Sequence, residues 1–198
     1  MNNKRLLPIV EGEGDERAVP ELLRRILHHH ERFDVEVLKP HRRGELPKVR
    51  ANFDRFFKTA LLEDASVICV LDYDCATCDD VERDEQELRT LANGVNAQAG
   101  FDACLIVKEF ESLFLCDPAA TRAALPLVDT KLNFPANPES VRDAKGWLSE
   151  AQPKGAAYKP TAHQAKIVSH LNLDHLLEKS PSYRRLAQAV LRLTEEAP

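Results

Sequence analysis

The chain has 198 residues, of which 43% are hydrophobic and 30% are charged, so it can bury the core of one ordinary domain. No apolar run reaches the roughly 20 residues that a membrane-spanning helix needs. Residues 1–8 lack the apolar core of a signal peptide, which predicts a cytoplasmic protein. The net charge of −5 excludes the overall basic bias of many nucleic-acid-binding chains.

The five cysteines are odd in number, and Cys69 and Cys104 lie within apolar runs, as buried free thiols do. We therefore expect a reducing compartment and no disulfide framework. Cys75 and Cys78 form a single Cys-x-x-Cys. A zinc site would need a second pair, and the acidic surroundings disfavour thiolate chemistry.

Hydrophobic periodicity predicts the first elements. An apolar run at 5–10 indicates a strand, and after a turn the apolar residues from Val19 to Leu27 recur at helical spacing. Pro20 suits only the first turn, so this helix is expected to begin just before it. A short strand is expected at 34–38, a polar loop at 41–46 and a second helix at 47–62.

The apolar run at 67–71 predicts a third, buried strand, and 101–107 a fourth. A helix is expected between them at 79–99, where Thr77 and Asp80 resemble a weakened capping box. Another helix is expected to begin at residue 112. Strands that alternate with helices predict an α/β fold with a parallel sheet.

The pattern changes after Pro118, because six prolines fall between residues 118 and 160. Helices are expected at 121–125, 138–151, 161–177 and 181–194. We divide the chain into an α/β core at 1–117 and a helical C-terminal extension at 118–198 that packs on the core as part of one compact unit.

Acidic residues follow three of the predicted strands. Glu11 follows the first, Asp72 and Asp74 the third, and Glu109 and Glu111 the fourth. The carboxyl ends of parallel strands meet at one edge, where sites of open α/β folds form. Hard oxygen ligands with no His or Cys set nearby favour Mg²⁺ or Mn²⁺. The sequence therefore predicts a divalent-metal site at this edge.

A basic segment at 41–60 comes before Asp72 and Asp74 in the chain. It could accommodate a phosphodiester backbone, and the candidate nucleic-acid contacts are Arg42, Arg43, Lys48 and Arg50. A solvated helix face is the plainer interpretation of the same charges.

Two motifs carry a resemblance to a known family. Residues 9–16, Ile-Val-Glu-Gly-Glu-Gly-Asp-Glu, resemble the first Toprim motif, and residues 71–74, Leu-Asp-Tyr-Asp, resemble the second. The resemblance covers roughly residues 4–116. It implies a Toprim-like (Rossmann-like) parallel four-stranded sheet flanked by helices, with a C-terminal helical cover.

The whole chain looks most like an uncharacterised bacterial Toprim-like family, whose members carry segments like residues 108–115, 158–160 and 180–186. That family is similar to the Toprim nuclease half of OLD-type proteins, whose ATPase is fused or separately encoded. This chain has no Gly-x-x-x-x-Gly-Lys-Ser/Thr loop, so an ATPase would be a separate partner.

The resemblance implies a Mg²⁺- or Mn²⁺-dependent phosphodiesterase, a DNA or RNA nuclease in a phage-defence or restriction setting. Glu11 would be a metal ligand or general base, and Asp15, Asp72 and Asp74 would bind the metal. Asp15 could equally be a helix cap. Glu111 is preferred over Glu109 as the functional acid of the third cluster.

Lys159 is the candidate cation for the charge that develops on the phosphate, with Lys154 and Lys145 as substitutes. Two other functions stay open. One is a non-catalytic Toprim module that binds nucleic acid or a partner ATPase. The other is a hydrolase of small phosphorylated nucleotides, which the net negative charge favours.

Overall fold

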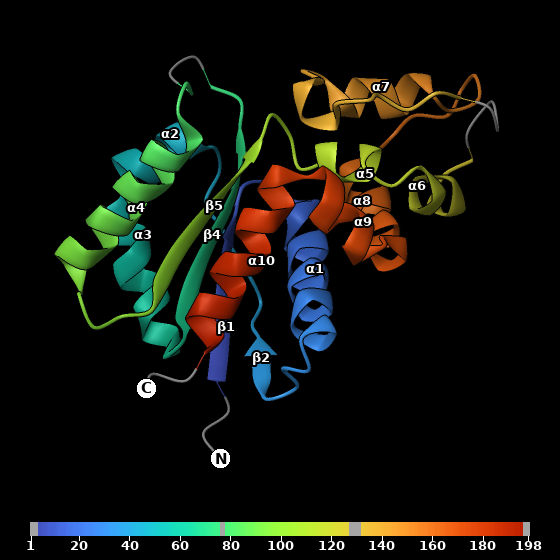
Figure 1. Ribbon diagram of the computed structural model, residues 1–198. Helices are drawn as coiled ribbons and strands as arrows, with labels where there is room; N and C mark the ends of the chain where they lie inside the picture. Colours follow the sequence, from blue (N-terminus) through green and yellow to red (C-terminus); the bar gives the residue numbers. More distant parts are fainter. Residues whose placement is uncertain (1–3, 76–77, 127–131, 196–198) are drawn as a thin grey trace.

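A computed structural model describes residues 4–75, 78–126 and 132–195 (Figure 1). Its sheet is parallel throughout, with strand order β2-β1-β4-β5. These strands are β1 (Lys4–Val10), β2 (Val35–Val37), β4 (Ser66–Tyr73) and β5 (Phe101–Val107). The predicted α/β fold with a parallel sheet flanked by helices is confirmed.

The described residues contain a fifth strand, β3 (His41–Arg42), which pairs with Ile9 and Val10 of β1. The predictions of four strands and of a loop at 41–46 were wrong at this point. Two polar residues offer no hydrophobic alternation, so periodicity cannot detect such a strand.

The strand register brings the carboxyl ends of three strands to one edge. Val10 of β1 pairs with Val70, and Tyr73 of β4 pairs with Val107 of β5. Glu11 therefore leaves β1 near the level at which Asp72 lies in β4, and the turn after β5 begins beside them.

The two faces of the sheet bury different cores, because successive side chains of a strand point to opposite faces. On one face, Ile68 and Val70 pack with α1 (Asp15–His29) and α10 (Pro181–Thr194). On the other, Val67 and Cys69 pack with α3 (Phe53–Ala60) and α4 (Val81–Val95). Figure 1 shows these helix layers on either side of the sheet.

Helix α1 begins at Asp15, five residues before Pro20, so the predicted start was wrong. Pro20 lacks the N–H that would bond to the Glu16 carbonyl, so one helical hydrogen bond is lost. The proline ring lies on the buried face of the helix together with Val19 and Leu23. Burial of that face offsets the lost bond.

The helix predicted at 47–62 consists of α2 (Leu46–Ala51), α3 and the 3₁₀ turn η1 (Leu61–Glu63). The break falls at Asn52, whose φ of −123° lies outside the helical region. Both parts keep the predicted apolar face, because Val49, Phe53 and Phe57 are all buried.

Side-chain caps divide the later helices. Asn172 accepts from the Asp174 and His175 amides, so the segment predicted as one helix is α8 (Pro160–His170) and α9 (Leu173–Lys179). Asp143 caps α7 (Ala144–Glu150), which follows the 3₁₀ turn η2 (Pro138–Ser140). Asp80 caps α4 by accepting from Arg83, whereas Thr77, the other half of the predicted capping box, lies outside the described residues.

The segment after Pro118 covers one face of the sheet. Helix α8 packs on α1 and on α6 (Pro118–Ala124), and α10 lies across β5 and β4. The short helix α5 (Ser112–Leu115) joins this cover to β5. Helix α7, orange in Figure 1, lies beyond the carboxyl ends of the strands. No helix in the described ranges is long and apolar enough to cross a bilayer.

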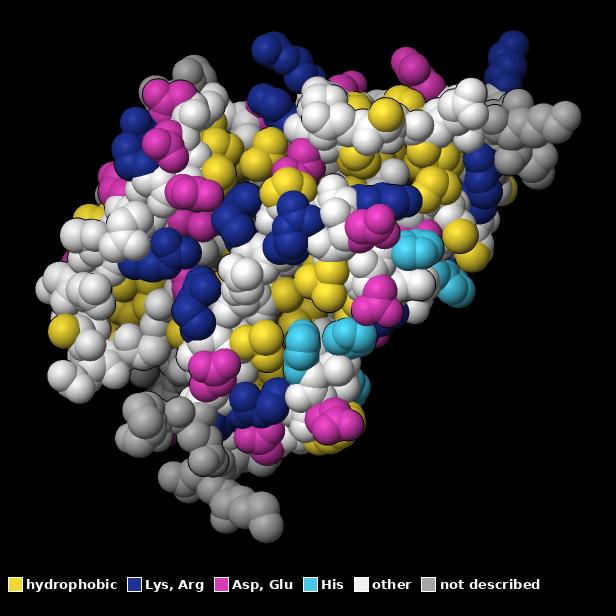
Figure 2. Space-filling model, viewed as in Figure 1, with side chains coloured by type: hydrophobic (Ala, Val, Ile, Leu, Met, Phe, Trp, Pro, Cys, Tyr) yellow, Lys and Arg dark blue, Asp and Glu magenta, His cyan; other side chains and the backbone are white. Residues whose placement is uncertain are grey.

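The outer edge of β5 is closed by side chains. The Leu105 amide donates to Glu85 of α4, and Arg185 of α10 donates to the Leu105 carbonyl. A groove of about 790 Å³ lies over this edge, and Figure 2 shows Lys and Arg side chains gathered between α4 and α10. Because these partners satisfy the backbone of an edge strand, they prevent it from pairing with another chain.

Candidate functional site

Three carboxylates surround one lysine ammonium at the carboxyl edge of the sheet. Lys145 Nζ lies 3.2 Å from Asp72 Oδ2, 3.2 Å from Glu109 Oε1 and 3.5 Å from Glu111 Oε2. Asp72 belongs to β4, the two glutamates follow β5, and Lys145 comes from α7. The C-terminal cover therefore contributes directly to the cluster.

Backbone hydrogen bonds hold this arrangement. The Phe110 amide donates to Asp72 Oδ1 at 2.8 Å, which ties the turn after β5 to the end of β4. The Lys145 amide donates to Glu109 Oε2 at 3.0 Å, which ties the start of α7 to the same turn. Lys108 makes the turn with a φ of +66°, a conformation uncommon outside glycine.

Glu111 is fully buried, and two side chains from the cover hold one of its oxygens. Oε1 accepts from the Tyr158 hydroxyl at 3.0 Å and from Gln164 Nε2 at 2.9 Å. Among the described residues, Oε2 has no hydrogen-bond donor, and its ion-pair partner is the Lys145 ammonium at 3.5 Å. Sequence analysis assigned no role to Tyr158 or Gln164, although the family-like stretch that begins at Tyr158 was the available signal.

The loop after β1 adds Glu11 and Asp15 to the cluster. The Gly12 amide donates to Asp15 Oδ2 at 2.8 Å. Gly14 lies so close to α8 that a Cβ there would be 2.1 Å from Gln164 Oε1. Only glycine fits at this approach, so the Val-Glu-Gly-Glu-Gly-Asp segment is shaped by its contact with α8.

Burial and mutual repulsion disfavour the charged forms of these acids. Burial, followed by the charge of Asp15, raises the pKa of Glu11 to about 7. Burial also raises the pKa of Asp15, and it raises the pKa of Asp72 well above its usual value even though Lys145 opposes the shift. One ammonium is therefore too little positive charge for the cluster, and a cation of higher charge would stabilise it more.

A cavity of about 240 Å³ opens beside the cluster. Its lining includes Glu11, Asp72, Glu109 and Lys145, together with Asp74. Asp74 does not join the group around Lys145, since it is half-exposed and its partner is Lys108 Nζ at 3.4 Å. The structure thus brings four predicted acids together, namely Glu11, Asp15, Asp72 and Glu111, and leaves Asp74 at the cavity wall.

Lys159, the candidate cation from sequence analysis, lies elsewhere. Its side chain is exposed, and in the described ranges it pairs with none of the carboxylates. Its backbone amide donates to His163 at the start of α8. Lys145, named only as a substitute, is the lysine that lies among the acids.

The four predicted nucleic-acid contacts differ in their surroundings. Arg50 pairs with Asp84 at 3.0 Å and is largely buried, and Arg42 pairs with two acids of the first loop and helix, Glu13 and Glu16. Arg43 stacks over the Phe56 ring, and Lys48 is exposed. The charges that suggested a basic patch are partly neutralised within the fold.

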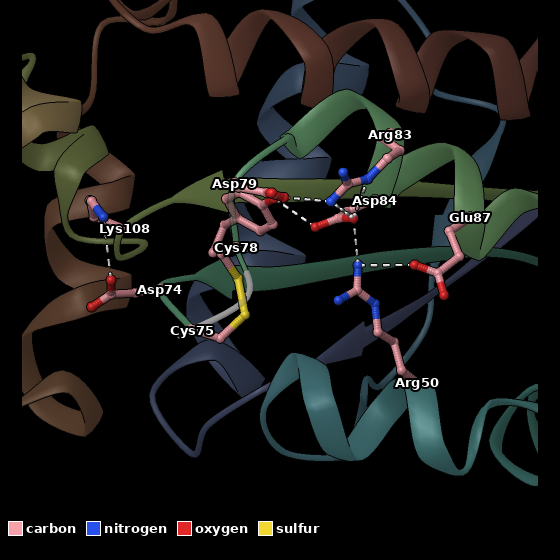
Figure 3. Close-up of a disulfide and its surroundings, with 10 residues drawn as sticks. Arg50, Asp74, Cys75, Cys78, Asp79, Arg83, Asp84, Glu87 and Lys108 are labelled. Atoms are coloured by element: carbon pink, nitrogen blue, oxygen red, sulfur yellow. Dashed lines mark hydrogen bonds and ion pairs between the residues drawn. A yellow bond between two sulfur atoms is a disulfide. The ribbon is translucent and has the colours of Figure 1, made fainter.

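Cys75 and Cys78 form a disulfide, so the expectation of free thiols was wrong for this pair. Their Cα atoms lie 5.1 Å apart, and the Cys78 amide donates to the Cys75 carbonyl (Figure 3). Cys75 directly follows Asp74 and lines the same cavity. Cys69, Cys104 and Cys116 are free and buried, as expected of structural thiols.

Comparison with protein families finds one match. The sequence profile described as "Domain of unknown function (DUF4276)" matches residues 10–191. The chain belongs to the DUF4276 family. No curated protein matches this DUF4276 chain.

Two solved structures resemble the DUF4276 chain at low identity. The C-terminal region of the Burkholderia pseudomallei OLD protein is 13% identical, with a TM-score of 0.48 over 96% of this chain and 98% of that one. The C-terminal region of the Xanthomonas campestris pv. campestris OLD protein is 16% identical, with a TM-score of 0.46 over 96% and 95%.

The possible metal-ligand atoms of the DUF4276 site are of the chemical type that a hard divalent cation prefers. They are carboxylate oxygens, and the buried Glu111 Oε2 lacks a hydrogen-bond donor. In the arrangement seen, no three or more His, Cys, Asp or Glu side chains of the described ranges are grouped so that they could hold an ion. The Lys145 ammonium lies between the oxygens that such an ion would use.

Proposed function

We propose that this DUF4276 protein is a Mg²⁺- or Mn²⁺-dependent phosphodiesterase that acts as a DNA or RNA nuclease. The observation that carries the proposal is the meeting of Asp72, Glu109 and Glu111 around Lys145 at one sheet edge, beside a cavity that Glu11 also lines. The order of the two Toprim-like motifs along the chain supports a Toprim-like interpretation of the core. Phosphodiester hydrolysis by metal ions needs such a carboxylate set.

Each residue has a role that follows from its surroundings. Asp72 and Glu111 would hold the cation, with Asp15 next to them and Asp74 at the cavity wall. A bound divalent cation would supply Lewis-acid stabilisation of the phosphoryl oxygens and activation of water. Glu11 lines the cavity and would accept the proton of the attacking water.

Lys145 is the cation that we assign to the substrate phosphate, in place of Lys159. Its side chain lines the cavity, so it can reach an anionic group there. Tyr158 and Gln164 hold Glu111 by hydrogen bonds, and neither residue lines the cavity. A phage-defence or restriction setting and a separately encoded ATPase belong to the same proposal and rest on the sequence resemblance.

A second candidate is the hydrolysis of small phosphorylated nucleotides. The cavity of about 240 Å³ is small, and five acidic side chains line it against two lysines. Arg42 and Arg50, which a polymer backbone would need, are paired within the fold. These observations favour a compact substrate over a long one.

The test is cleavage of plasmid, single-stranded DNA and RNA with Mg²⁺ or Mn²⁺ and with chelator. We expect Asp72→Asn to lose at least about 100-fold in cleavage rate. Asp54→Asn, at an exposed position on α3, is the matched control and should retain the full rate. Cleavage that persists with chelator or in Asp72→Asn would sink the proposal.

Two outcomes point to the other functions. Hydrolysis of nucleotides but of no polymer, with Mn²⁺ bound, would favour the small-substrate enzyme. A protein that binds nucleic acid or an ATPase but no metal would be the non-catalytic module.

A further inference from the structure

Lys145 is the sole positive partner of three acids within the described ranges. Asp72, Glu109 and Glu111 form ion pairs with its ammonium and with no other basic side chain described. A single positive charge faces up to three negative ones. The Lys145 ammonium therefore holds these carboxylates together, but its single charge cannot neutralise all three of them.

The acids are fixed, whereas the lysine is free to move. Glu111 is fully buried and is held by Tyr158 and Gln164. Asp72 is held by the Phe110 amide. The Lys145 side chain is 38% exposed and borders the cavity, so it can swing into open space without disturbing the acids.

A divalent cation and the ammonium compete for the same oxygens. Mg²⁺ binds carboxylate oxygens at about 2.0–2.1 Å, and two cations so close together repel each other strongly in a partly buried site. The buried Glu111 Oε2, which lacks a hydrogen-bond donor, marks where a second cation would gain most. One cation must leave when the other binds.

Resting on the proposed function, we propose that Lys145 is an internal counter-ion that a divalent cation displaces. Displacement turns the ammonium toward the cavity, where it meets an anionic substrate. Binding is then ordered, with the metal first and the phosphate second.

The first test measures Mn²⁺ binding to the full chain by calorimetry and by the electron paramagnetic resonance of free Mn²⁺. We expect Lys145→Gln to bind Mn²⁺ at least about tenfold more tightly than the unmodified chain. Lys108→Gln is the matched control, because Lys108 lines the same cavity and pairs with Asp74 at 3.4 Å. It should change the affinity by less than about threefold.

Equal tightening in both variants would indicate a general effect of net charge and would overturn the proposal. Weaker binding by Lys145→Gln would overturn it too. Circular dichroism and thermal melting confirm that both variants fold.

The second test follows Lys145 itself by acetylation with acetic anhydride and peptide mass spectrometry. Addition of Mg²⁺ should raise the labelling of Lys145 relative to Lys108 in the same sample. Labelling that stays constant while Mn²⁺ binds would show that the ammonium does not leave, and the proposal would fail.

Both tests use metal without nucleic acid, so they separate the two proposals. Displacement of Lys145 without any cleavage would refute the nuclease and leave the counter-ion standing. Metal-dependent cleavage with unchanged labelling of Lys145 would support the nuclease and refute the displacement of Lys145. A chain that binds no Mn²⁺, with or without Lys145, would refute both.

Discussion

Arg50 of α2 reaches across to α4 and pairs with Asp84 at 3.0 Å, although its charge had suggested a contact with nucleic acid. The Asp84 side chain is almost fully buried, and Tyr73 at the end of β4 donates its hydroxyl to it at 2.6 Å. Figure 3 shows Arg50 and Asp84 near the disulfide, with Glu87 paired to the same Arg50 nitrogen. Arg50 thus joins two helices at the end of the central strand.

Arg50→Gln should lower the free energy of unfolding by about 1–3 kcal/mol, because a buried carboxylate loses one of its charged partners. Denaturant titration measures the change. Lys48→Gln, at an exposed position of the same helix, should stay within about 0.5 kcal/mol. If Arg50→Gln kept full stability but bound nucleic acid less tightly, the assignment made from sequence would be restored.

Asp84 should make stability depend on pH. Burial acts to raise its pKa, but hydrogen bonds from Tyr73 and Arg50 outweigh burial and hold the pKa below its usual value. The folded state then binds fewer protons than the unfolded state in acid. The stabilisation is present above the ordinary pKa of about 4 and is lost as the pH falls through the folded value.

Unfolding titrations between about pH 5 and pH 2 should show this loss. Asp84→Asn should be less stable at neutral pH and should show a shallower decline in acid. Asp54→Asn, on the exposed face of α3, should decline as steeply as the unmodified chain. An unchanged slope in Asp84→Asn would contradict the prediction.

The sequence pointed to the acids that meet at this edge, but it ranked Lys145, which pairs with three of them, only as a substitute for Lys159. Glu11, Asp72 and Glu111 could be found because each follows an apolar run, and parallel strands end at a common edge. Lys145 lies 73 residues beyond Asp72 in the chain. Its position depends on how α7 packs, which no periodicity records.

The same limit explains why neither the partner of Arg50 nor the disulfide was predicted. A run of basic residues shows charge but not partners, and the partner of Arg50 lies on a helix more than thirty residues away. The apolar runs around Cys69 and Cys104 correctly indicated buried free thiols. They could not show that Cys75 lies close enough to Cys78 to form a disulfide.

The closed edge of β5 yields a prediction about association. Glu85 accepts from the Leu105 amide and pairs with Arg185 and Arg89, and its carboxylate is buried. Glu85→Ala should lower the free energy of unfolding by about 3–5 kcal/mol, because two partly buried arginines lose a partner. It also frees the Leu105 amide at a sheet edge, so self-association should increase.

Analytical ultracentrifugation over a range of concentrations measures that association. Glu82→Ala, at an exposed position of α4 that lines the same groove, is the matched control and should associate no more than the unmodified chain. A Glu85→Ala protein that stays unassociated at high concentration would show that Glu85 does not protect the edge.

Substitution of Gly14 tests the contact between the loop after β1 and α8. A Cβ at this position would lie 2.1 Å from Gln164 Oε1 and 2.7 Å from Pro160 Cβ, so Gly14→Ala must displace α8 or the loop. Overpacking of this kind costs about 1–3 kcal/mol. Because Gln164 also holds Glu111, Mn²⁺ affinity should fall together with stability.

Gly94→Ala is the matched control, because a Cβ there meets nothing within 4 Å. As an alanine inside α4 it should stabilise the chain by about 0.5–1 kcal/mol and leave Mn²⁺ binding unchanged. Thermal melting and calorimetry on both variants separate the effects. Should Gly14→Ala melt and bind Mn²⁺ like the unmodified chain, the approach of α8 to the loop would have no part in forming the site.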